Sequence, residues 1–287
     1  MTAINSFPDY PARIIIDSCS EVALLSDLHK FSLTRVPFKF YIDDDEFVDQ
    51  DLNRSELIDR MHLSKNKVRT ACPSPQAFFD VMDPNAVNFV VTISSKLSSS
   101  YNSACLAKSM AEEKGFGDRV YIFDSLSAVS GEDLTALYII ETLKRGFKPN
   151  DLFHIVRDYI THMSTYFVLN SFENLVKNGR IKHSVALVGK LLKINPIMKG
   201  VNGEIELKEK CRGHKKALFS LAKIISDEVE SPQTKNLAIT HVNAPETALK
   251  LKAAVEKTET PFKSILIFES GGLGTVYAVQ GGIVIAF

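Results

Sequence analysis

Short pairs of serine or aspartate residues directly follow three apolar segments in the first half of the sequence. These pairs are Asp17-Ser18, Ser94-Ser95 and Asp124-Ser125. The second pair also opens a serine-rich run over residues 94–100. Hydroxyl groups and free backbone amides at such a turn suit an anionic group, such as a carboxylate or a phosphate. Each pair taken alone fits a helix cap equally well, so the pattern indicates either a binding site or a set of caps.

The three pairs lie together only if the segments before them form one parallel sheet. The apolar segments, residues 13–17, 88–93 and 119–123, alternate with patterns typical of helices. Parallel strands need long crossover connections of this kind, and helices then cover both faces of the sheet. Ligands of such sheets bind beyond the carboxyl ends of the strands. We therefore predict a doubly wound α/β domain whose site lies at that edge.

Capping signals predict where the helices of this domain begin. Ser18-Cys19-Ser20-Glu21 reads as a capping box, in which the Ser18 hydroxyl and the Glu21 carboxylate bind free backbone amides. Asn53-x-x-Glu56 and Ser74-Pro75 predict two further helix starts. Longer helices are expected over residues 98–114, 130–145 and 150–163, and a second strand over residues 33–42 that contains Pro37.

The second half of the sequence mixes strands and helices less regularly. Asn202-Gly203 is a strong hairpin turn between strands expected at 194–199 and 204–209, because both residues tolerate a positive φ. Further strands are expected at 165–169, 237–241 and 264–268, with two more around Gly281-Gly282. We predict two closely packed domains: a doubly wound, mostly parallel α/β domain over residues 1–165 and an α/β domain with a mixed sheet over residues 166–287.

The composition excludes several classes of protein. The 287 residues include 34 Lys+Arg and 34 Asp+Glu, so the formal net charge is zero. A neutral chain without a block of basic residues has no signature of nucleic-acid binding or of adhesion to an anionic membrane. No apolar run approaches the ~18 residues that cross a bilayer, so we expect a cytoplasmic protein without stable membrane insertion. The four cysteines are far apart and predict neither disulfides nor a zinc site.

Signatures of common cofactor and catalytic sites are missing. Gly271-Gly272-Leu273-Gly274 lacks the spacing of a dinucleotide-binding loop, and we expect it to form an ordinary loop. The sequence contains no phosphate-binding P-loop, no G-x-S-x-G and no H-E-x-x-H. Asp43-Asp44-Asp45-Glu46 lacks the spacing of a calcium loop and is expected to be a solvated turn. No metal, cofactor or catalytic residue is predicted.

Several short motifs are spread in a fixed order over nearly the whole chain. They are Asp17-Ser18, Val36-Pro37, Thr70-Ala71-Cys72-Pro73-Ser74, Ser94-Ser95-Lys96-Leu97-Ser98-Ser99-Ser100-Tyr101, Asp124-Ser125, Asn178-Gly179-Arg180-Ile181 and Leu191-Leu192-Lys193-Ile194-Asn195-Pro196-Ile197. Their order resembles the DegV family of fatty-acid-binding proteins. Short motifs of this kind recur by chance, but their order and spread make the combination specific.

This resemblance implies a two-domain α/β protein that holds one long-chain fatty acid. The acyl tail would occupy an apolar tunnel, and Thr70 and Ser95 would hydrogen-bond the carboxylate near the domain junction. Ser94 and Arg180 would be supporting residues. In the family, a separate catalytic subunit of fatty acid kinase phosphorylates the bound carboxylate with ATP. The resemblance therefore implies a carrier without a cofactor of its own, not an enzyme.

The sequence departs from the family at the carboxyl-terminal motif H-x-G-P-G, which falls on Tyr277-Ala278-Val279-Gln280-Gly281. Tyr277 thus stands where a histidine would approach the head group, and it can donate a hydrogen bond without sharing the proton affinity of imidazole. Two alternatives stay open. One is an enzyme or kinase subunit acting on a small polar substrate in a cleft like that of dihydroxyacetone kinases. The other is a binding module whose ligand has changed.

Overall fold

A parallel four-stranded sheet forms the centre of the amino-terminal half. The computed structural model describes residues 9–22, 32–50, 52–64, 66, 68–181 and 194–287. The strand order is β2-β1-β6-β7, and all pairs are parallel. The strands are β1 (Ala12–Asp17), β2 (Ser32–Val36), β6 (Val87–Thr92) and β7 (Val120–Asp124). The predicted parallel α/β sheet is confirmed.

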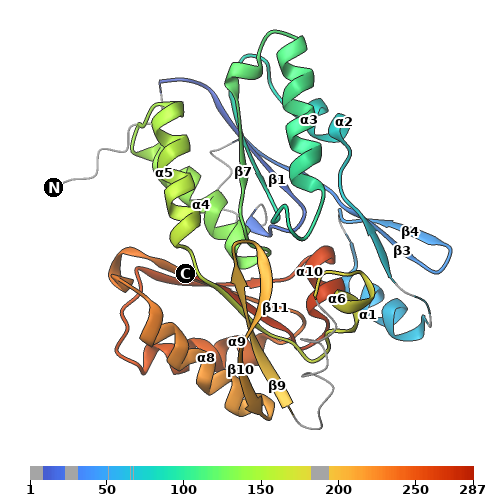
Figure 1. The fold of residues 1–287 in the computed structure, drawn as a ribbon, viewed down its shortest axis with the longest axis vertical. Coiled ribbons are helices and arrows are strands. Elements are labelled where there is room, and N and C mark those ends of the chain that lie inside the picture. Colours follow the sequence, from blue (N-terminus) through green and yellow to red (C-terminus); the bar gives the residue numbers. More distant parts are fainter. Residues whose placement is uncertain (1–8, 23–31, 51, 65, 67, 182–193) are drawn as a thin grey trace.

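Helices cover both faces of this sheet (Figure 1). Successive residues of a strand point to opposite faces, and β1 shows the consequence. Ile14 and Ile16 pack in the cluster that contains residues of α4 (Ser130–Lys144) and α5 (Pro149–His162). Ile15 packs instead with residues of α2 (Pro75–Asp80) and α3 (Ser100–Glu113). Both faces are buried, as the continuous apolar character of β1 requires.

A mixed six-stranded sheet forms the carboxyl-terminal half, in the order β10-β9-β8-β13-β11-β12. Only β11 and β12 pair in parallel. The strands are β8 (Thr165–Val168), β9 (Ile194–Val201), β10 (Glu204–Arg212), β11 (Asn236–His241), β12 (Ser264–Glu269) and β13 (Ile283–Ala286). The helices α8 (His214–Glu228) and α9 (Pro245–Glu256) pack on this sheet, while α4 contacts β11 and β13 from the other domain. The predicted boundary between residues 165 and 166 stays a prediction.

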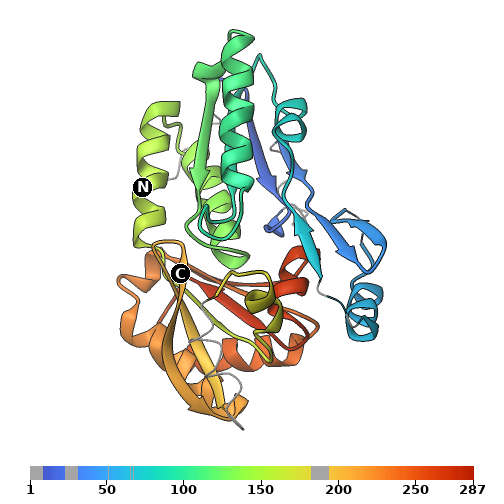
Figure 2. The same cartoon turned by 45° about the vertical axis from the view of Figure 1, so that its right-hand side comes forward.

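The expected strand over residues 33–42 is wrong, because Pro37 divides it between two sheets. β2 ends at Val36, and β3 (Lys39–Ile42) belongs to an antiparallel three-stranded sheet of order β4-β3-β5. Its other strands are β4 (Asp45–Val48) and β5 (Arg69–Ala71). Proline has no N–H for a ladder, and the next amide, that of Phe38, donates to the Ser18 hydroxyl over 2.9 Å. This small sheet carries Thr70 and projects from the side of the molecule with α1 (Arg54–Leu63) (Figures 1 and 2).

Two helix starts are confirmed and one is wrong. Asn53 and Ser74 accept from backbone amides at the starts of α1 and α2, as predicted. The predicted capping box is wrong, because its groups bind distant partners: the Ser18 hydroxyl donates to Asp49, and the Glu21 amide donates to Asp133. Residues 23–31, where that helix was expected to continue, lie outside the described residues.

The carboxyl-terminal region contains a helix where a loop and a strand were expected. Gly271-Gly272-Leu273-Gly274 opens α10 (Gly272–Ala278), so the prediction of a loop there is wrong. Of the two strands expected around Gly281-Gly282, only β13 is present among the described residues. The expected motif Leu191-Leu192-Lys193 lies outside the described residues. Smaller elements are α6 (Glu173–Lys177), a 3-10 turn at Gly117–Arg119 and another at Pro232–Thr234.

The predicted β9–β10 hairpin is confirmed and reaches the amino-terminal domain. Asn202 and Gly203 have φ angles of 49° and 83°. At its tip, the carbonyl of Gly203 accepts a 2.9 Å hydrogen bond from the buried Ser94 hydroxyl. A Cβ at position 203 would lie 2.4 Å from that hydroxyl, so glycine is required for the approach. No helix in the described part of the chain is both long enough and apolar enough to cross a membrane.

Candidate functional site

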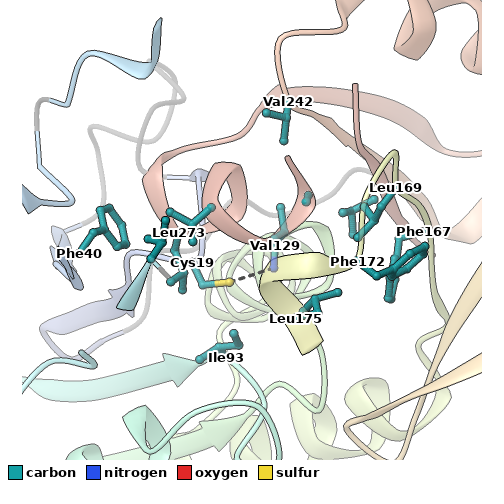
Figure 3. Packing of buried hydrophobic residues seen from close by; sticks show 14 of the residues in the cluster. Cys19, Phe40, Ile93, Val129, Phe167, Leu169, Phe172, Leu175, Val242 and Leu273 are labelled. Carbon is teal, nitrogen blue, oxygen red and sulfur yellow. Dashed lines mark hydrogen bonds between the residues drawn. The ribbon is translucent and has the colours of Figure 1, made fainter. Parts of the chain in front are cut away.

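A cavity of about 330 Å³ lies between the two domains, at the carboxyl ends of β1 and β6. This volume is at the lower end of the range of ~300–1,000 Å³ that small-molecule sites occupy. Apolar side chains line most of it: Phe38, Ile93, Leu97, Val129, Phe167, Leu169, Leu175, Leu273 and Val284. Many of these side chains belong to the buried hydrophobic cluster that Figure 3 shows. Phe40 and Leu273 lie on one side of that cluster, and Phe167 and Phe172 lie on the other. The cavity therefore suits a ligand with an extended apolar part.

A pair of hydroxyl groups forms a polar point on the cavity wall. Thr70 Oγ1 and the Tyr277 hydroxyl lie 2.8 Å apart, and either can donate to the other. Thr70 comes from β5 of the small sheet, whereas Tyr277 comes from α10, 207 residues later. Both side chains line the cavity. Whichever hydroxyl accepts within this pair keeps its own proton free, and it can donate that proton in a hydrogen bond to a carboxylate.

Arg180 also lines the cavity, near the loop that follows β6. Its guanidinium donates to the carbonyl oxygens of Leu97 and Asn178. These contacts fix the side chain and hold the loop after β6 against α6. Within the described residues Arg180 forms no ion pair, although the acidic residue Glu204 lines the same cavity. Arg180 therefore contributes positive potential to the cavity.

Ser94 and Ser95 are not among the residues that line the cavity. Ser94 is fully buried and binds the hairpin tip, as described above. Ser95 is partly exposed, and its backbone amide donates to Asp124 over 3.1 Å. The structure thus brings Thr70, Tyr277 and Arg180 to one cavity, and it places the Ser94-Ser95 pair beside it. Ser98 and Ser99, from the serine-rich run that the sequence singled out, do line the cavity. Ser127 and Thr165 line it too, and no sequence pattern indicated these two residues.

The aspartates at the strand ends bind backbone amides of the surrounding loops. Asp17 accepts from the amides of Cys19 and Ile93 and from the Ser100 hydroxyl. Asp124 accepts from the amides of Ser95 and Leu126. These amides lie in loops and not at helix starts, so the contacts of the two aspartates match neither interpretation of the Ser and Asp pairs. Both aspartates lie at the rim of the cavity and are not among the residues that line it.

Several acidic groups are buried behind this rim. Asp17, Cys19 and Glu132 place one ligand atom each within 4.8 Å of one another, the spacing of a metal site. Burial, together with the nearby charges of Asp17 and Asp133, raises the pKa of Glu132 well above its usual range. In the cluster as it stands, burial therefore favours the protonated form of Glu132.

The family profile described as "Uncharacterised protein, DegV family" matches residues 11–287. The chain belongs to the DegV family. A DegV domain-containing protein of Streptococcus pyogenes serotype M1 is 31% identical over 278 residues, which cover 96% of this chain and 98% of that relative.

Solved DegV structures share the fold over almost their full length. A DegV family protein from Ruminococcus gnavus, refined with vaccenic acid, has a TM-score of 0.90 and 35% identity, and covers 97% of this chain and 100% of its own. The Fatty Acid Kinase (Fak) B3 protein of Streptococcus pneumoniae, loaded with linoleic acid, has a TM-score of 0.90 and 28% identity, with coverage of 96% and 98%. A DegV protein from Eubacterium eligens, loaded with heptadecanoic acid, has a TM-score of 0.88 and 27% identity, again with coverage of 96% and 98%.

The DegV motifs identified in the sequence are spread over both domains, and the fold collects them. Thr70, Arg180 and Tyr277 belong to three motifs that lie far apart in the sequence and meet at one cavity. Leu273 and Gly274 line the same cavity but were not predicted, because the glycine-rich segment gives no helical pattern. Asp49 was not predicted either, since it belongs to no recognisable motif. Only the contacts of Asp49 with α10 reveal its place beside the site.

Proposed function

We propose that this DegV protein binds one long-chain fatty acid and presents its carboxylate to the catalytic subunit of a fatty acid kinase. The acyl tail occupies the apolar cavity, and Thr70 and Ser95 hold the carboxylate, with Tyr277 beside Thr70. Ser94 and Arg180 support this arrangement. The observation that carries the proposal is the apolar cavity between the domains with the Thr70 and Tyr277 hydroxyls on its wall. The fatty acids bound to structural relatives support it.

The tail and the head group contribute differently to this binding. Burying an apolar chain yields ~0.8 kcal/mol per CH₂, which gives a gross gain on the order of 10 kcal/mol for a chain of ordinary fatty-acid length. Each hydrogen bond to the charged head adds ~1.5–3 kcal/mol. The tail therefore supplies most of the affinity, and the hydroxyl groups orient the carboxylate. Local recognition of this kind agrees with a chain whose net charge is zero.

The described contacts give each head-group residue a different role. Thr70 and Tyr277 share one hydrogen bond, so the hydroxyl that accepts within this pair is free to donate a hydrogen bond to the carboxylate. Ser95 follows Ser94 beside the cavity, and in this proposal its hydroxyl donates a second hydrogen bond to the head group. Ser94 keeps the hairpin closed over the cavity. Arg180 supplies positive potential that stabilises the negative charge of the bound carboxylate.

Native mass spectrometry of the purified protein tests the proposal directly. We expect a bound species whose added mass equals that of one long-chain fatty acid, released on denaturation. Delipidated protein is expected to take up one equivalent of oleic acid. Recovery of no acyl chain, together with no uptake of added fatty acid, would refute the proposal.

The kinase step needs a separate test, because a carrier and an enzyme differ in what they do alone. We expect acyl phosphate to form from ATP and fatty acid only when this protein and a catalytic subunit of fatty acid kinase are both present. Acyl phosphate formed by this protein alone would favour the enzyme alternative. A polar substrate in a dihydroxyacetone-kinase-like cleft is less favoured by the structure, because the cavity at the strand ends is lined mainly by apolar side chains.

A further inference from the structure

We infer that Asp49 is a positioning residue for the head group, because it holds α10 and thereby places Tyr277 against Thr70. This inference rests on the proposed binding of a fatty acid. Asp49 follows β4 in the amino-terminal domain and is only 2% exposed. Its carboxylate oxygens accept from the backbone amides of Gly272 over 2.9 Å and Leu273 over 3.0 Å. These are the first two amides of α10, in the other domain.

Neighbouring groups complete this contact between the domains. The Ser18 hydroxyl donates to the same carboxylate over 2.7 Å, and Arg35 lies 3.5 Å from its other oxygen. Glu21 accepts from the amide of Gly271 over 2.6 Å, directly before the helix. The free amides at the start of α10 therefore bind side chains of the other domain, and not a cap from their own segment.

The glycines before and within α10 are explained by this approach. A Cβ at Gly271 would lie 2.3 Å from a Glu21 oxygen, and a Cβ at Gly272 would lie 2.4 Å from an Asp49 oxygen. A Cβ atom does not approach a non-bonded oxygen this closely, so only glycine at these positions lets the side chains of Glu21 and Asp49 reach the backbone. The glycine-rich segment, which fits no dinucleotide-binding pattern, thus has a role in joining the domains.

The far end of α10 carries the proposed head-group residue. Tyr277 lies five residues after Gly272, and its hydroxyl is 2.8 Å from Thr70. Thr70 belongs to the small sheet of the amino-terminal domain, so α10 contacts that domain at both of its ends. A helix of seven residues has little stability of its own, and its position depends on the groups that bind its ends. Loss of an Asp49 contact should therefore displace Tyr277.

The substitution Asp49→Asn separates this role from general support of the fold. Asparagine has nearly the same shape, but only one of its two terminal atoms can accept from an amide, whereas both aspartate oxygens do so. We expect Asp49→Asn to lower the preference for oleic acid over methyl oleate about tenfold, as does Tyr277→Phe, because one hydrogen bond to a charged group is worth about this factor. Affinity for the methyl ester should change less than about twofold in both variants.

Non-additivity is the readout that a merely structural role would not give. If Asp49 acts through Tyr277, the double variant Asp49→Asn/Tyr277→Phe should lose no more than about twofold in acid preference beyond Tyr277→Phe alone. Lys263→Ala is the matched control, because it removes an ion pair between the domains, with Glu141, away from α10. We expect the control to keep the wild-type preference.

The outcomes are distinct. Additive losses of acid preference, or equal losses of affinity for acid and ester in Asp49→Asn, would overturn the positioning role of Asp49. Wild-type protein that binds neither ligand would instead overturn the proposed function. If Asp49→Asn does not fold, Ser18→Ala is the second variant, because it removes one donor to the same carboxylate. We expect it to reduce the acid preference by a smaller factor. An unchanged preference in Ser18→Ala would count against the inference.

Discussion

Thr70 and Tyr277 contribute hydroxyl groups to a cavity that is otherwise mainly apolar, and this contrast makes their role testable. Thr70→Val keeps the shape of the side chain and removes its hydroxyl. We expect the affinity for oleic acid to fall by about 1.5–3 kcal/mol, because a hydrogen bond to a charged group is lost. The affinity for methyl oleate should change little. Isothermal titration calorimetry with both ligands measures the difference, and a larger loss for the ester would contradict a head-group role.

Ser95 lies beside the cavity, so its predicted contact with the carboxylate needs its own test. We expect Ser95→Ala to weaken oleic acid binding by about 1.5 kcal/mol while the purified protein still retains an acyl chain. Ser109→Ala is a matched control, because Ser109 lies on the exposed side of α3 and donates only to the carbonyl of Cys105. Equal changes for acid and ester in Ser95→Ala would contradict the predicted role.

Val279 has a backbone conformation that favours glycine. Its φ of 52° and ψ of 169° lie in a region that residues with a Cβ rarely adopt, at a cost of about 1–3 kcal/mol. The related DegV motif has glycine at this position. We expect Val279→Gly to raise the free energy of unfolding by about 1 kcal/mol, after subtracting the greater entropy of glycine in the unfolded chain. Urea denaturation measures this change.

A second valine provides the comparison for this strain. Val229 has a φ of −76° and a ψ of 126°, which any residue adopts. Val229→Gly should therefore lower the free energy of unfolding, because it gains chain entropy in the unfolded state and loses packing. Equal destabilisation by both substitutions would show that Val279 is not strained.

At the scale of elements, the β9–β10 hairpin closes the cavity through one buried hydrogen bond. The Ser94 hydroxyl and the Gly203 carbonyl come from different domains. We expect Ser94→Ala to cost about 1–2 kcal/mol of stability, because it leaves the carbonyl without this donor. Hydrogen exchange of the amides in residues 200–205 should become faster than in wild type, with Ser109→Ala as the control. Unchanged exchange in the hairpin would rule out this closing role.

The elements that the sequence predicted correctly are those with strong local signals. β1 and β6 are continuous apolar runs, and Asn53, Ser74 and Asn202-Gly203 have side chains or φ preferences that determine the local backbone. α10 gives the opposite case, because three of four residues in Gly271-Gly272-Leu273-Gly274 disfavour a helix. The amide of Gly271, directly before the helix, binds Glu21, and the amide of Gly272 binds Asp49; both partners lie more than 200 residues earlier. Contacts at that separation leave no pattern in the local sequence.

The site shows the same division between local and distant information. Thr70, Arg180 and Tyr277 were predicted from DegV motifs, and the cavity brings all three together. The expected capping box at Ser18 and Glu21 fitted its local pattern, but Asp49 and Asp133 bind those groups instead. Local sequence could not rank these competing partners, because the winning ones become neighbours only after the sheets have packed.

At the scale of the whole molecule, buried acidic groups join the two domains and predict an unusual dependence of stability on pH. Burial raises the pKa of Glu21 from 4.5 to about 8, although Arg35 opposes the shift. Burial likewise raises the pKa of Asp133 to about 7 and that of Asp17 to about 6. These three groups lie in the amino-terminal domain, and Glu21 contacts the backbone before α10.

The pKa of one partly exposed glutamate, Glu228, shifts in the opposite direction. Burial opposes the ionisation of Glu228, but hydrogen bonds from Lys208, Tyr166 and Lys199 lower its pKa to about 2. Its contribution to stability is therefore present above about pH 4.5 and is lost as the pH falls toward about 2. Loss of the Glu228 contacts therefore lowers the stability below about pH 4.5, whereas ionisation of the buried groups changes it between about pH 4 and 8.

The buried groups should make the folded protein less stable as the pH rises from about 4.5 to 8. In that window the unfolded chain releases the proton of Glu21 while the folded chain retains it, so the free energy of unfolding falls by up to about 1.4 kcal/mol per pH unit. Glu21→Gln imitates the protonated acid and can still accept from the Gly271 amide. We expect this variant to gain stability relative to wild type between pH 5 and pH 8, measured by urea denaturation, whereas Glu246→Gln, an exposed control, should follow the wild-type profile. If the free energy of unfolding of wild type and Glu21→Gln depended on pH in the same way, Glu21 would already be ionised in the folded protein. Its contact with the backbone before α10 would then be that of a charged carboxylate paired with Arg35.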